Sequence, residues 1–392
     1  MSRPRTLLVG LAVLVAALGL GAYWLTAGDE ASSLQASVSV ADAMSSDTTG
    51  YRRAATVRDF TFPEDHGPHP DFKNEWWYVT GNLSGPDGQP FGYELTIFRF
   101  ALQPPQDDVQ LASMGGSGWR TDQFYMAHFA VTDGAGETFH ADERFGRGGA
   151  GLAGAQADPF RVWLEDWSIE STGEDPFPMR LRAQQDGAAI DLTVRPEKPR
   201  VLQGDRGLSQ KGPCVGNASY YYAYTRLATE GTVVSGGDTT QVSGQSWMDR
   251  EWSTSALGPN QVGWDWFALQ LDDGRDLMYY QLRNTDGSAS RFSEGTIVGP
   301  DGRKTAVGRE EVEVEVLDTW TSPDGTHTYP VEWRLQVPSA NVDVRITALM
   351  KNQEMDVSVR YWEGTVRVTG TDTGRGYVEL TGYGDSAASP AS

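Results

Sequence analysis

Cysteine and histidine are scarce in this sequence, and positive charge is in deficit. The single cysteine, Cys214, excludes an internal disulfide and every metal site that needs several cysteines. Five histidines and the absence of a His-Glu-x-x-His motif argue against a transition-metal centre, so we expect no metal. The 53 acidic residues outnumber the 32 basic ones and give a formal net charge of −21. That sign excludes a protein that binds nucleic acid by neutralising its phosphates.

Motifs that bind common cofactors are also lacking. Gly146, Gly148 and Gly151 formally fit G-x-G-x-x-G, but neither the preceding strand nor the long following helix of a dinucleotide site is evident. No G-x-x-x-x-G-K-[ST] phosphate loop occurs, and Gly244–Met248, the nearest approach to a hydrolase nucleophile elbow, lacks the final glycine. We therefore expect no cofactor.

Amphipathic helices of 12 residues or more are missing from the body of the chain. Short alternating runs are separated there by turn dipeptides. Trp76–Leu83, the turn Asp87-Gly88 and Phe91–Phe100 together have the signature of a β-hairpin. Strands at this spacing, with this turn chemistry, predict an all-β protein built from antiparallel sandwiches or barrels.

The second half of the sequence repeats a pattern of the first half. A strand containing tryptophan leads into the Asp87-Gly88 turn, and a strand ending in arginine, Tyr93–Arg99, follows it. The same order recurs around a second Asp-Gly turn, which is followed by Met278–Arg283. This repeat predicts two β-barrels in tandem.

The glycine- and threonine-rich segment Thr229–Val242 is the predicted boundary between the two barrels. We accordingly assign an N-terminal domain to residues 57–235 and a C-terminal domain to residues 236–385. Residues 386–392 form a short tail.

The N-terminus has the pattern of a membrane-targeting segment. Arg3 and Arg5 precede an uncharged apolar run over residues 7–27, which as a helix would be about 30 Å long and would cross a bilayer core. Residues 1–27 are either a signal anchor or a cleaved signal peptide, and 28–56 are a linker. The positive charge before the run predicts an extracytoplasmic body, periplasmic or at the cell surface. That body is either anchored to the cytoplasmic membrane or secreted after cleavage.

Tryptophans and carboxylates alternate in several dense motifs. In Ser246–Ser255 (SWMDREWSTS), Asp249 and Glu251 share one face of the expected strand, and Arg250 and Trp252 share the other. Alternation places residues of a strand on faces, but it does not tell which face looks inward.

The motifs Asn74–Leu83 (NEWWYVTGNL) and Gly263–Leu271 (GWDWFALQL) alternate in the same way, with Trp264 and Trp266 opposite Asp265. The candidate catalytic acids are Asp249, Glu251 and Asp265. The candidate ligand-binding residues are Trp76, Trp77, Arg250, Trp252, Trp264, Trp266 and Tyr279.

Two interpretations of these motifs stay open. In the first, the tryptophans fill the barrel interiors and the carboxylates pair with Arg99 or Arg250. In the second, a hollow barrel offers a cavity with an aromatic wall and one or two carboxyl groups. Burial would raise the pKa of such a carboxyl group toward neutrality, as a general acid requires. Among the histidines, His66 and His69 are expected in a loop, and His128 within a strand as a core or cavity residue.

Eight segments carry a family resemblance. They are NEWWYVTGNL (Asn74–Leu83), YMAHFAVTD (Tyr125–Asp133), GLAGAQ (Gly151–Gln156), VLQGDRGLSQKG (Val201–Gly212), SWMDREWSTS (Ser246–Ser255), GWDWFALQL (Gly263–Leu271), YWEGTVRVTG (Tyr361–Gly370) and GYVELTGYG (Gly376–Gly384). With them, the chain from about Phe60 to Tyr383 resembles the family that unites AttH-type proteins with carotenoid 1,2-hydratases (hydroxyneurosporene synthases). The resemblance implies two lipocalin-like domains, in agreement with the repeat.

For function the resemblance implies two branches. The hydratases add water to a terminal isoprenoid double bond without a cofactor: an acid protonates the alkene, and aromatic faces stabilise the cation. The hydratase segment that matches SWMDREWSTS has a histidine and a tryptophan. These positions align with Arg250 and Trp252 here, and an arginine does not donate its proton at ordinary pH. The AttH-like branch resembles proteins often associated with ABC-type export permeases, which the apolar N-terminal run fits.

Our leading hypothesis is therefore a membrane-tethered, extracytoplasmic, lipocalin-like protein that binds a hydrophobic or isoprenoid-like molecule. An ABC transporter permease is its candidate protein partner. The alternative is a cofactor-independent hydro-lyase or isomerase that acts on an isoprenoid or polyketide-like alkene. A third interpretation is a structural or partner-binding protein whose barrels are filled.

Overall fold

Alternating side chains give this chain strands almost throughout. The computed structural model describes residues 48–105, 121–254, 257–258 and 260–384, and over these residues it has two antiparallel sheets and no α-helix. The all-β prediction is thereby confirmed. Three short 3₁₀ turns are also described: η2 (Glu64–His66), η3 (Arg309–Glu311) and η4 (Pro338–Ala340).

The predicted targeting segment 1–27, most of the predicted linker 28–56 and the tail 386–392 lie outside the described residues. Across the part of the chain that the structure does describe, no helix has the length and apolar character needed to span a bilayer.

The first sheet has thirteen strands in the order β4-β3-β2-β1-β13-β12-β9-β8-β7-β6-β5, with β10 and β11 paired to β12. Its strands are β1 (Asn74–Ser84), β2 (Pro90–Ala101), β3 (Gln123–Asp133), β4 (Thr138–Arg147), β5 (Ala153–Ala157), β6 (Phe160–Leu164), β7 (Trp167–Ser171), β8 (Met179–Gln185), β9 (Ala188–Pro196), β10 (Val201–Leu202), β11 (Leu208–Gln210), β12 (Ala218–Ser235) and β13 (Asp238–Ser253).

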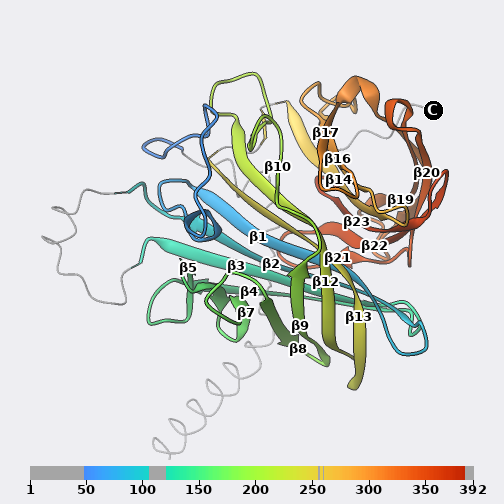
Figure 1. Cartoon of the computed structure of the whole chain (residues 1–392), viewed down its shortest axis with the longest axis horizontal. Helices are drawn as coiled ribbons and strands as arrows, with labels where there is room; N and C mark the ends of the chain where they lie inside the picture. Colours follow the sequence, from blue (N-terminus) through green and yellow to red (C-terminus); the bar gives the residue numbers. More distant parts are fainter. Residues whose placement is uncertain (1–47, 106–120, 255–256, 259, 385–392) are drawn as a thin grey trace, which may run out of the picture. The chain divides into compact units, whose positions relative to one another are not determined.

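The second sheet has ten strands in the order β17-β16-β15-β14-β23-β22-β20-β19-β18, with β21 paired to β22. Its strands are β14 (Gln261–Leu271), β15 (Asp276–Asn284), β16 (Glu294–Val298), β17 (Lys304–Gly308), β18 (Glu313–Thr321), β19 (Thr328–Val337), β20 (Val342–Ala348), β21 (Glu354–Met355), β22 (Tyr361–Gly370) and β23 (Gly374–Leu380). Figure 1 shows it as a nearly closed barrel, drawn in orange and red, beside the half-barrel of the first sheet. The predicted tandem of lipocalin-like barrels is confirmed.

The two sheets share one plan. In each of them the first strand pairs with the second strand on one side and with the last strand on the other: β1 lies between β2 and β13, and β14 between β15 and β23. The predicted hairpin is β1–β2, in which Asn74 lies opposite Phe100 and Ser84 opposite Pro90. In its turn Gly88 has a φ of +75°, a left-handed conformation that favours glycine. The sequence repeat thus corresponds to a repeated topology.

The described chain passes from the first sheet to the second between β13, which ends at Ser253, and β14, which begins at Gln261. The predicted domain boundary between residues 235 and 236 falls in the turn that joins β12 to β13, and both of these strands belong to the first sheet. As a division into folding domains, the boundary stays a prediction.

Large side chains fill the interiors of both barrels. Trp77, Trp167 and Trp252 are fully buried in the core of the first barrel, and Trp333 and Trp362 in the core of the second. Trp77 of the Asn74–Leu83 motif and Trp252 of the Ser246–Ser255 motif therefore fill the interior of the first barrel and do not line a cavity there. For these two indoles the structure agrees with the interpretation in which tryptophans fill the barrel interiors.

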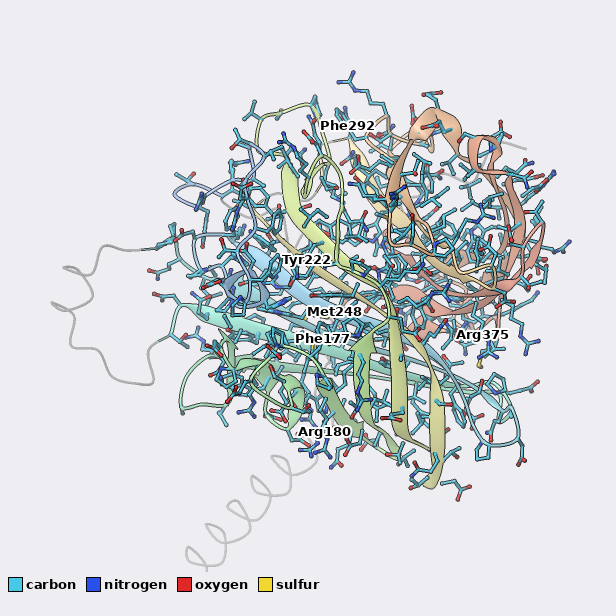
Figure 2. All side chains as sticks on the ribbon, in the orientation of Figure 1. Phe177, Arg180, Tyr222, Met248, Phe292 and Arg375 are labelled. Carbon is cyan, nitrogen blue, oxygen red and sulfur yellow. The ribbon has the colours of Figure 1, made fainter. Side chains whose placement is uncertain are left out.

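A separate apolar cluster lies between the two sheets. Tyr78, Tyr221 and Trp247 of the first sheet pack there with Trp266 and Tyr280 of the second. Figure 2 places residues from both regions in the molecule: Met248 belongs to the interior of the first barrel, and Phe292 packs against the intersheet cluster. Strands β1 and β14, and the Ser246–Ser253 half of β13, therefore bury both of their faces.

A charged network inside the first barrel holds β1, β2 and β13 together. Glu75 of β1 forms ion pairs with Arg99 of β2 and Arg250 of β13, and all three side chains are buried. The backbone N–H of His69 also donates to the carboxylate of Glu75, at 3.0 Å. Burial by itself raises the pKa of Glu75, but Arg99 and Arg250 outweigh it and hold that pKa well below its ordinary value. Arg250, a candidate ligand-binding residue, thus has a partner inside the barrel.

We predict that Glu75→Gln lowers the free energy of unfolding by about 3–5 kcal/mol at neutral pH, because two buried guanidinium groups lose their counterion. The pKa of Glu75 is lower in the folded state than its ordinary value of 4.5. Its stabilisation is therefore present above that pH and is lost as the pH falls through the lowered value.

Urea denaturation of both proteins across an acidic pH series checks this prediction. Glu230→Gln serves as the control, because the carboxylate of Glu230 pairs with Arg195 at an exposed position. Equal stability losses in the two variants would contradict the role assigned to the buried network.

Candidate functional site

A chamber lies between the two sheets, on the faces that point away from the barrel interiors. Its cavity has a volume of about 110 Å³ that water-sized molecules can occupy. Its apolar lining residues are Trp76, Phe98, Phe100, Met126, Leu257, Trp264, Trp266, Leu282 and Val359. Its polar lining residues are Asn74, Tyr78, Thr96, His128, Lys211, Tyr221, Asp249, Glu251, Tyr280, Tyr361, Glu363 and Glu379. Most of the surface that these residues present to the cavity is nevertheless apolar, and polar groups converge on it, which is the usual form of a small-molecule site.

Strand register builds the wall that the first sheet contributes. Asp249 of β13 lies opposite Tyr78 of β1, Tyr78 opposite Thr96 of β2, and Thr96 opposite His128 of β3. These four residues form a polar row across neighbouring strands on one face of the sheet. Adjacent strands are about 4.8 Å apart, and the row crosses three strand spacings. The backbones of Asp249 and His128, at its two ends, are therefore about 14 Å apart.

The second sheet contributes a corresponding row. Tyr280 of β15 lies opposite Trp266 of β14, Trp266 opposite Glu379 of β23, and Glu379 opposite Glu363 of β22. Two carboxyl groups are thus direct cross-strand neighbours, an arrangement that is destabilising when both are charged.

Asp249 is the chamber residue best suited to acid–base chemistry. Its side chain accepts hydrogen bonds from the Tyr221 hydroxyl at 2.6 Å and from the Trp247 indole N–H at 2.7 Å. Burial raises the pKa of Asp249 to about 7, although both hydrogen bonds favour the carboxylate. The group can therefore exchange a proton near neutral pH.

Glu251, the next residue on the same face of β13, has a positively charged neighbour. The ammonium group of Lys211 lies 3.6 Å from its carboxylate and 3.8 Å from the centroid of the Tyr280 ring. The aromatic wall of the chamber therefore already holds one ammonium group.

Glu363 provides a second buried carboxyl group on the opposite wall. The Tyr78 hydroxyl donates to its Oε1 at 2.5 Å, and its Oε2 has no hydrogen-bond partner among the residues that the structure describes. Burial raises the pKa of Glu363 well above its ordinary value, and the nearby carboxyl group of Glu94 raises it further. A carboxyl group in such surroundings holds its proton and can donate a hydrogen bond.

His128 closes the row at the far end of the chamber. Its Nδ1 is 2.8 Å from the Tyr361 hydroxyl, while its buried Nε2 has no partner in the structure. Burial lowers the pKa of His128 to about 3, so the ring is neutral. The expectation of a core or cavity histidine is confirmed, because His128 lines the chamber.

The structure divides the predicted site residues into two groups. Five of them line the chamber: Trp76, Asp249, Glu251, Trp264 and Trp266. The other five point into barrel interiors: Trp77, Arg250 and Trp252 in the first barrel, and Asp265 and Tyr279 in the second. Asp265 pairs there with Arg283 at 3.0 Å and accepts a hydrogen bond from the Tyr383 hydroxyl at 3.0 Å. The roles of all ten residues stay predictions, but only the first group shares one cavity.

Sequence reasoning did not assign Tyr78, Tyr361, Glu363 or Glu379 to the site. The available signal was alternation, because in YWEGTVRVTG and GYVELTGYG a tyrosine and a glutamate occupy the same face two residues apart. Within the described residues no group of three or more histidine, cysteine, aspartate or glutamate side chains is arranged to hold a metal ion.

Comparisons with known proteins identify a family and a shared fold. A family model described as AttH-like matches residues 53–383. The crystal structure of an AttH protein from Nitrosomonas europaea is 34% identical, with a TM-score of 0.75, and the match covers 85% of this chain and 99% of that one. Kievitone hydratase from Nectria haematococca shares the fold at 17% identity, with a TM-score of 0.63 and coverage of 85% and 96%.

One curated relative is a dehydratase, AsqC, from Emericella nidulans. It is 22% identical over 187 residues, which make up 45% of this chain and 50% of the relative. The chain thus spans about half the length of that protein.

We predict that the stability of the wild-type protein falls relative to that of Asp249→Asn as the pH rises from about 4 to about 7. The pKa of Asp249 is about 7 in the folded protein, against an ordinary value of 3.8, so the folded state binds this proton more tightly than the unfolded chain does. The amide of asparagine removes that dependence on pH.

Urea unfolding of both proteins at about pH 5 and about pH 8 measures the difference. The free energy of unfolding of Asp249→Asn should increase relative to that of the wild type at the higher pH. A constant difference between the two proteins would show that Asp249 ionises normally in the fold.

Proposed function

Because this chain belongs to the AttH-like family and carries a chamber with buried acid–base groups between its sheets, we propose that it is a cofactor-independent hydro-lyase or isomerase. Its substrate class is an apolar alkene or alcohol of isoprenoid or polyketide type. The observation that carries the proposal is Asp249, a buried carboxyl group whose pKa is raised to about 7, beside an aromatic wall. Such a group is suited to general acid and general base catalysis at neutral pH.

In the proposed hydration, each step uses a group that lines the chamber. The protonated Asp249 transfers its proton to one alkene carbon, and the positive charge develops on the more substituted carbon. The faces of Trp76 and Trp266 stabilise that charge. Water then forms a bond to the cationic carbon and loses a proton to a chamber carboxylate, which restores the starting charge. The reverse sequence eliminates water, and proton loss from a different carbon gives an isomer.

The names of similar proteins support this reaction class. One protein with the same fold is a hydratase, and one curated relative is a dehydratase. Hydration and dehydration are two directions of one reaction and need the same acid and base. The match to the dehydratase covers half of that protein, so for this chain the reaction rests on the chamber.

A second candidate function is a ligand carrier in the extracytoplasmic space. The observation that favours it is the apolar run over residues 7–27 behind Arg3 and Arg5, which fits an anchor on the cytoplasmic membrane. In that case the chamber would hold a hydrophobic molecule for an ABC-type export permease. A carrier needs the aromatic wall but does not need the proton of Asp249.

We predict that the protein incorporates oxygen-18 from labelled water into myrcene or linalool, two acyclic isoprenoid probes, by hydration or by exchange of the hydroxyl group. Asp249→Asn should lower the rate by a factor of about 10²–10⁴, the usual contribution of a general acid. Mass spectrometry of the extracted probe measures the incorporation.

Two further variants sharpen that test. Glu354→Gln alters a carboxyl group on β21 that bonds to the Tyr329 hydroxyl at 3.1 Å and does not line the chamber, and it should retain the rate. Asp265→Asn decides between Asp249 and Asp265 as the acid. A loss of rate at Asp265 without one at Asp249 would contradict the assignment. Ligand binding that survives in Asp249→Asn, with no turnover by the wild type, would favour the carrier.

A further inference from the structure

Three carboxyl groups of the chamber have no positively charged partner among the described residues. Asp249, Glu363 and Glu379 form no ion pair there, and the hydrogen bonds to Asp249 and Glu363 come from neutral donors. Lys211, the cation that lines the chamber, pairs with Glu251, and its charge also acts to lower the pKa of Asp249. This contrasts with the interior of the first barrel, where a buried carboxylate meets two guanidinium groups.

Glu363 and Glu379 face each other across β22 and β23, so their charges oppose one another. Burial raises the pKa of each well above its ordinary value; Glu94 adds to the effect on Glu363, and Glu363 to the effect on Glu379. The titratable groups that face this pair are Tyr78, Glu94, Asp249 and Glu251 from the first sheet and Tyr361 and Tyr377 from the second. All are acids, so without a ligand the pair retains protons.

Several other buried polar atoms on the chamber wall have no partner in the structure. They include Oε2 of Glu363, Nε2 of His128 and Oγ1 of Thr96, and each of these side chains is at most 1% exposed. Buried polar groups are normally satisfied, so their convergence on one cavity indicates a place built for an additional molecule.

Aromatic rings flank the carboxyl pair. Trp266 lies directly opposite Glu379, and the hydroxyl of Tyr78 bonds to Glu363. Ring faces and carboxylates together are the surroundings that proteins use for alkylated ammonium groups, because the methyl groups contact the rings and the charge meets the carboxylates. Lys211 against the Tyr280 ring shows that this wall accepts an ammonium group.

We infer that the chamber binds a lipophilic organic cation, with its tertiary or quaternary ammonium head between Glu363, Glu379 and Trp266, and that it releases a proton on binding. The row of Trp76, Phe98 and Met126 covers the apolar body of the ligand. The inference rests on the proposed function only in that it uses the same chamber, because its test requires no turnover. It also names a class of inhibitor, since such a cation resembles the charged intermediate of a hydration.

Isothermal titration calorimetry of the full chain with benzyltrimethylammonium tests the inference, with neopentylbenzene as the neutral molecule of the same shape. We expect the ammonium compound to bind at least about tenfold more tightly at pH 8. Cation binding favours the ionised carboxylates, so its affinity should rise by up to about tenfold per pH unit while that of neopentylbenzene stays constant. Titrations in two buffers of different ionisation enthalpy should report about one proton released per cation.

The double variant Glu363→Gln/Glu379→Gln should lose the preference for the cation and its pH dependence, and it should still bind neopentylbenzene, which shows that the chamber is intact. Glu354→Gln, the matched carboxyl change on the neighbouring strand β21, should leave the preference for the cation and its pH dependence unchanged. If the double variant does not fold, the wild-type comparison of the two ligands decides alone.

Equal affinity for the two ligands, no binding of either, or an affinity for the cation that does not change with pH would overturn the inference. These outcomes are separable from failure of the proposed function. Missing oxygen-18 incorporation with preserved cation binding overturns only the hydro-lyase, and turnover without a preference for the cation overturns only the cation site.

Discussion

The structure depends on the alternation of side chains along strands that are buried on both faces. Successive residues of β1 and β13 point alternately to the interior of the first barrel and to the space between the sheets. Over β1 and the Ser246–Ser253 half of β13 neither face meets bulk water, so a charged side chain there needs a partner or a changed pKa. The barrel face meets this need with the ion pairs of Glu75. On the chamber face Lys211 pairs with Glu251, and burial raises the pKa of Asp249 to about 7.

Alternation predicted much of the fold and part of the site. It correctly separated Asp249 from Arg250 and Trp76 from Trp77, and the Asp-Gly turns located both central hairpins. It did not tell which face was the chamber, because both faces carry tryptophan and charge. The chamber exists because β22 and β23 of the second sheet pack against strands of the first, and that contact joins residues nearly 300 positions apart, as in the Tyr78–Glu363 hydrogen bond.

The position of Arg250 changes what the family resemblance implies. Histidine at this position in hydratases suggested that an acid had been lost here. Arg250 lies inside the first barrel, where it bonds to Glu75 and to the carbonyl oxygen of Gly67 at 2.6 Å. Its presence therefore removes no proton donor from the chamber. Asp249, its neighbour in sequence, occupies the opposite face and has the raised pKa that acid chemistry needs.

The short stretch from Trp247 to Trp252 has a consequence for how such proteins diversify. Asp249 and Glu251 line the chamber and Trp247 packs in the intersheet cluster, whereas the even-numbered residues lie inside the first barrel. Substitutions at Asp249 and Glu251 therefore change the chemistry of the chamber, while the even positions continue to hold the barrel together. A lineage built on this plan can acquire new activities through its chamber-facing carboxyl groups while its architecture persists.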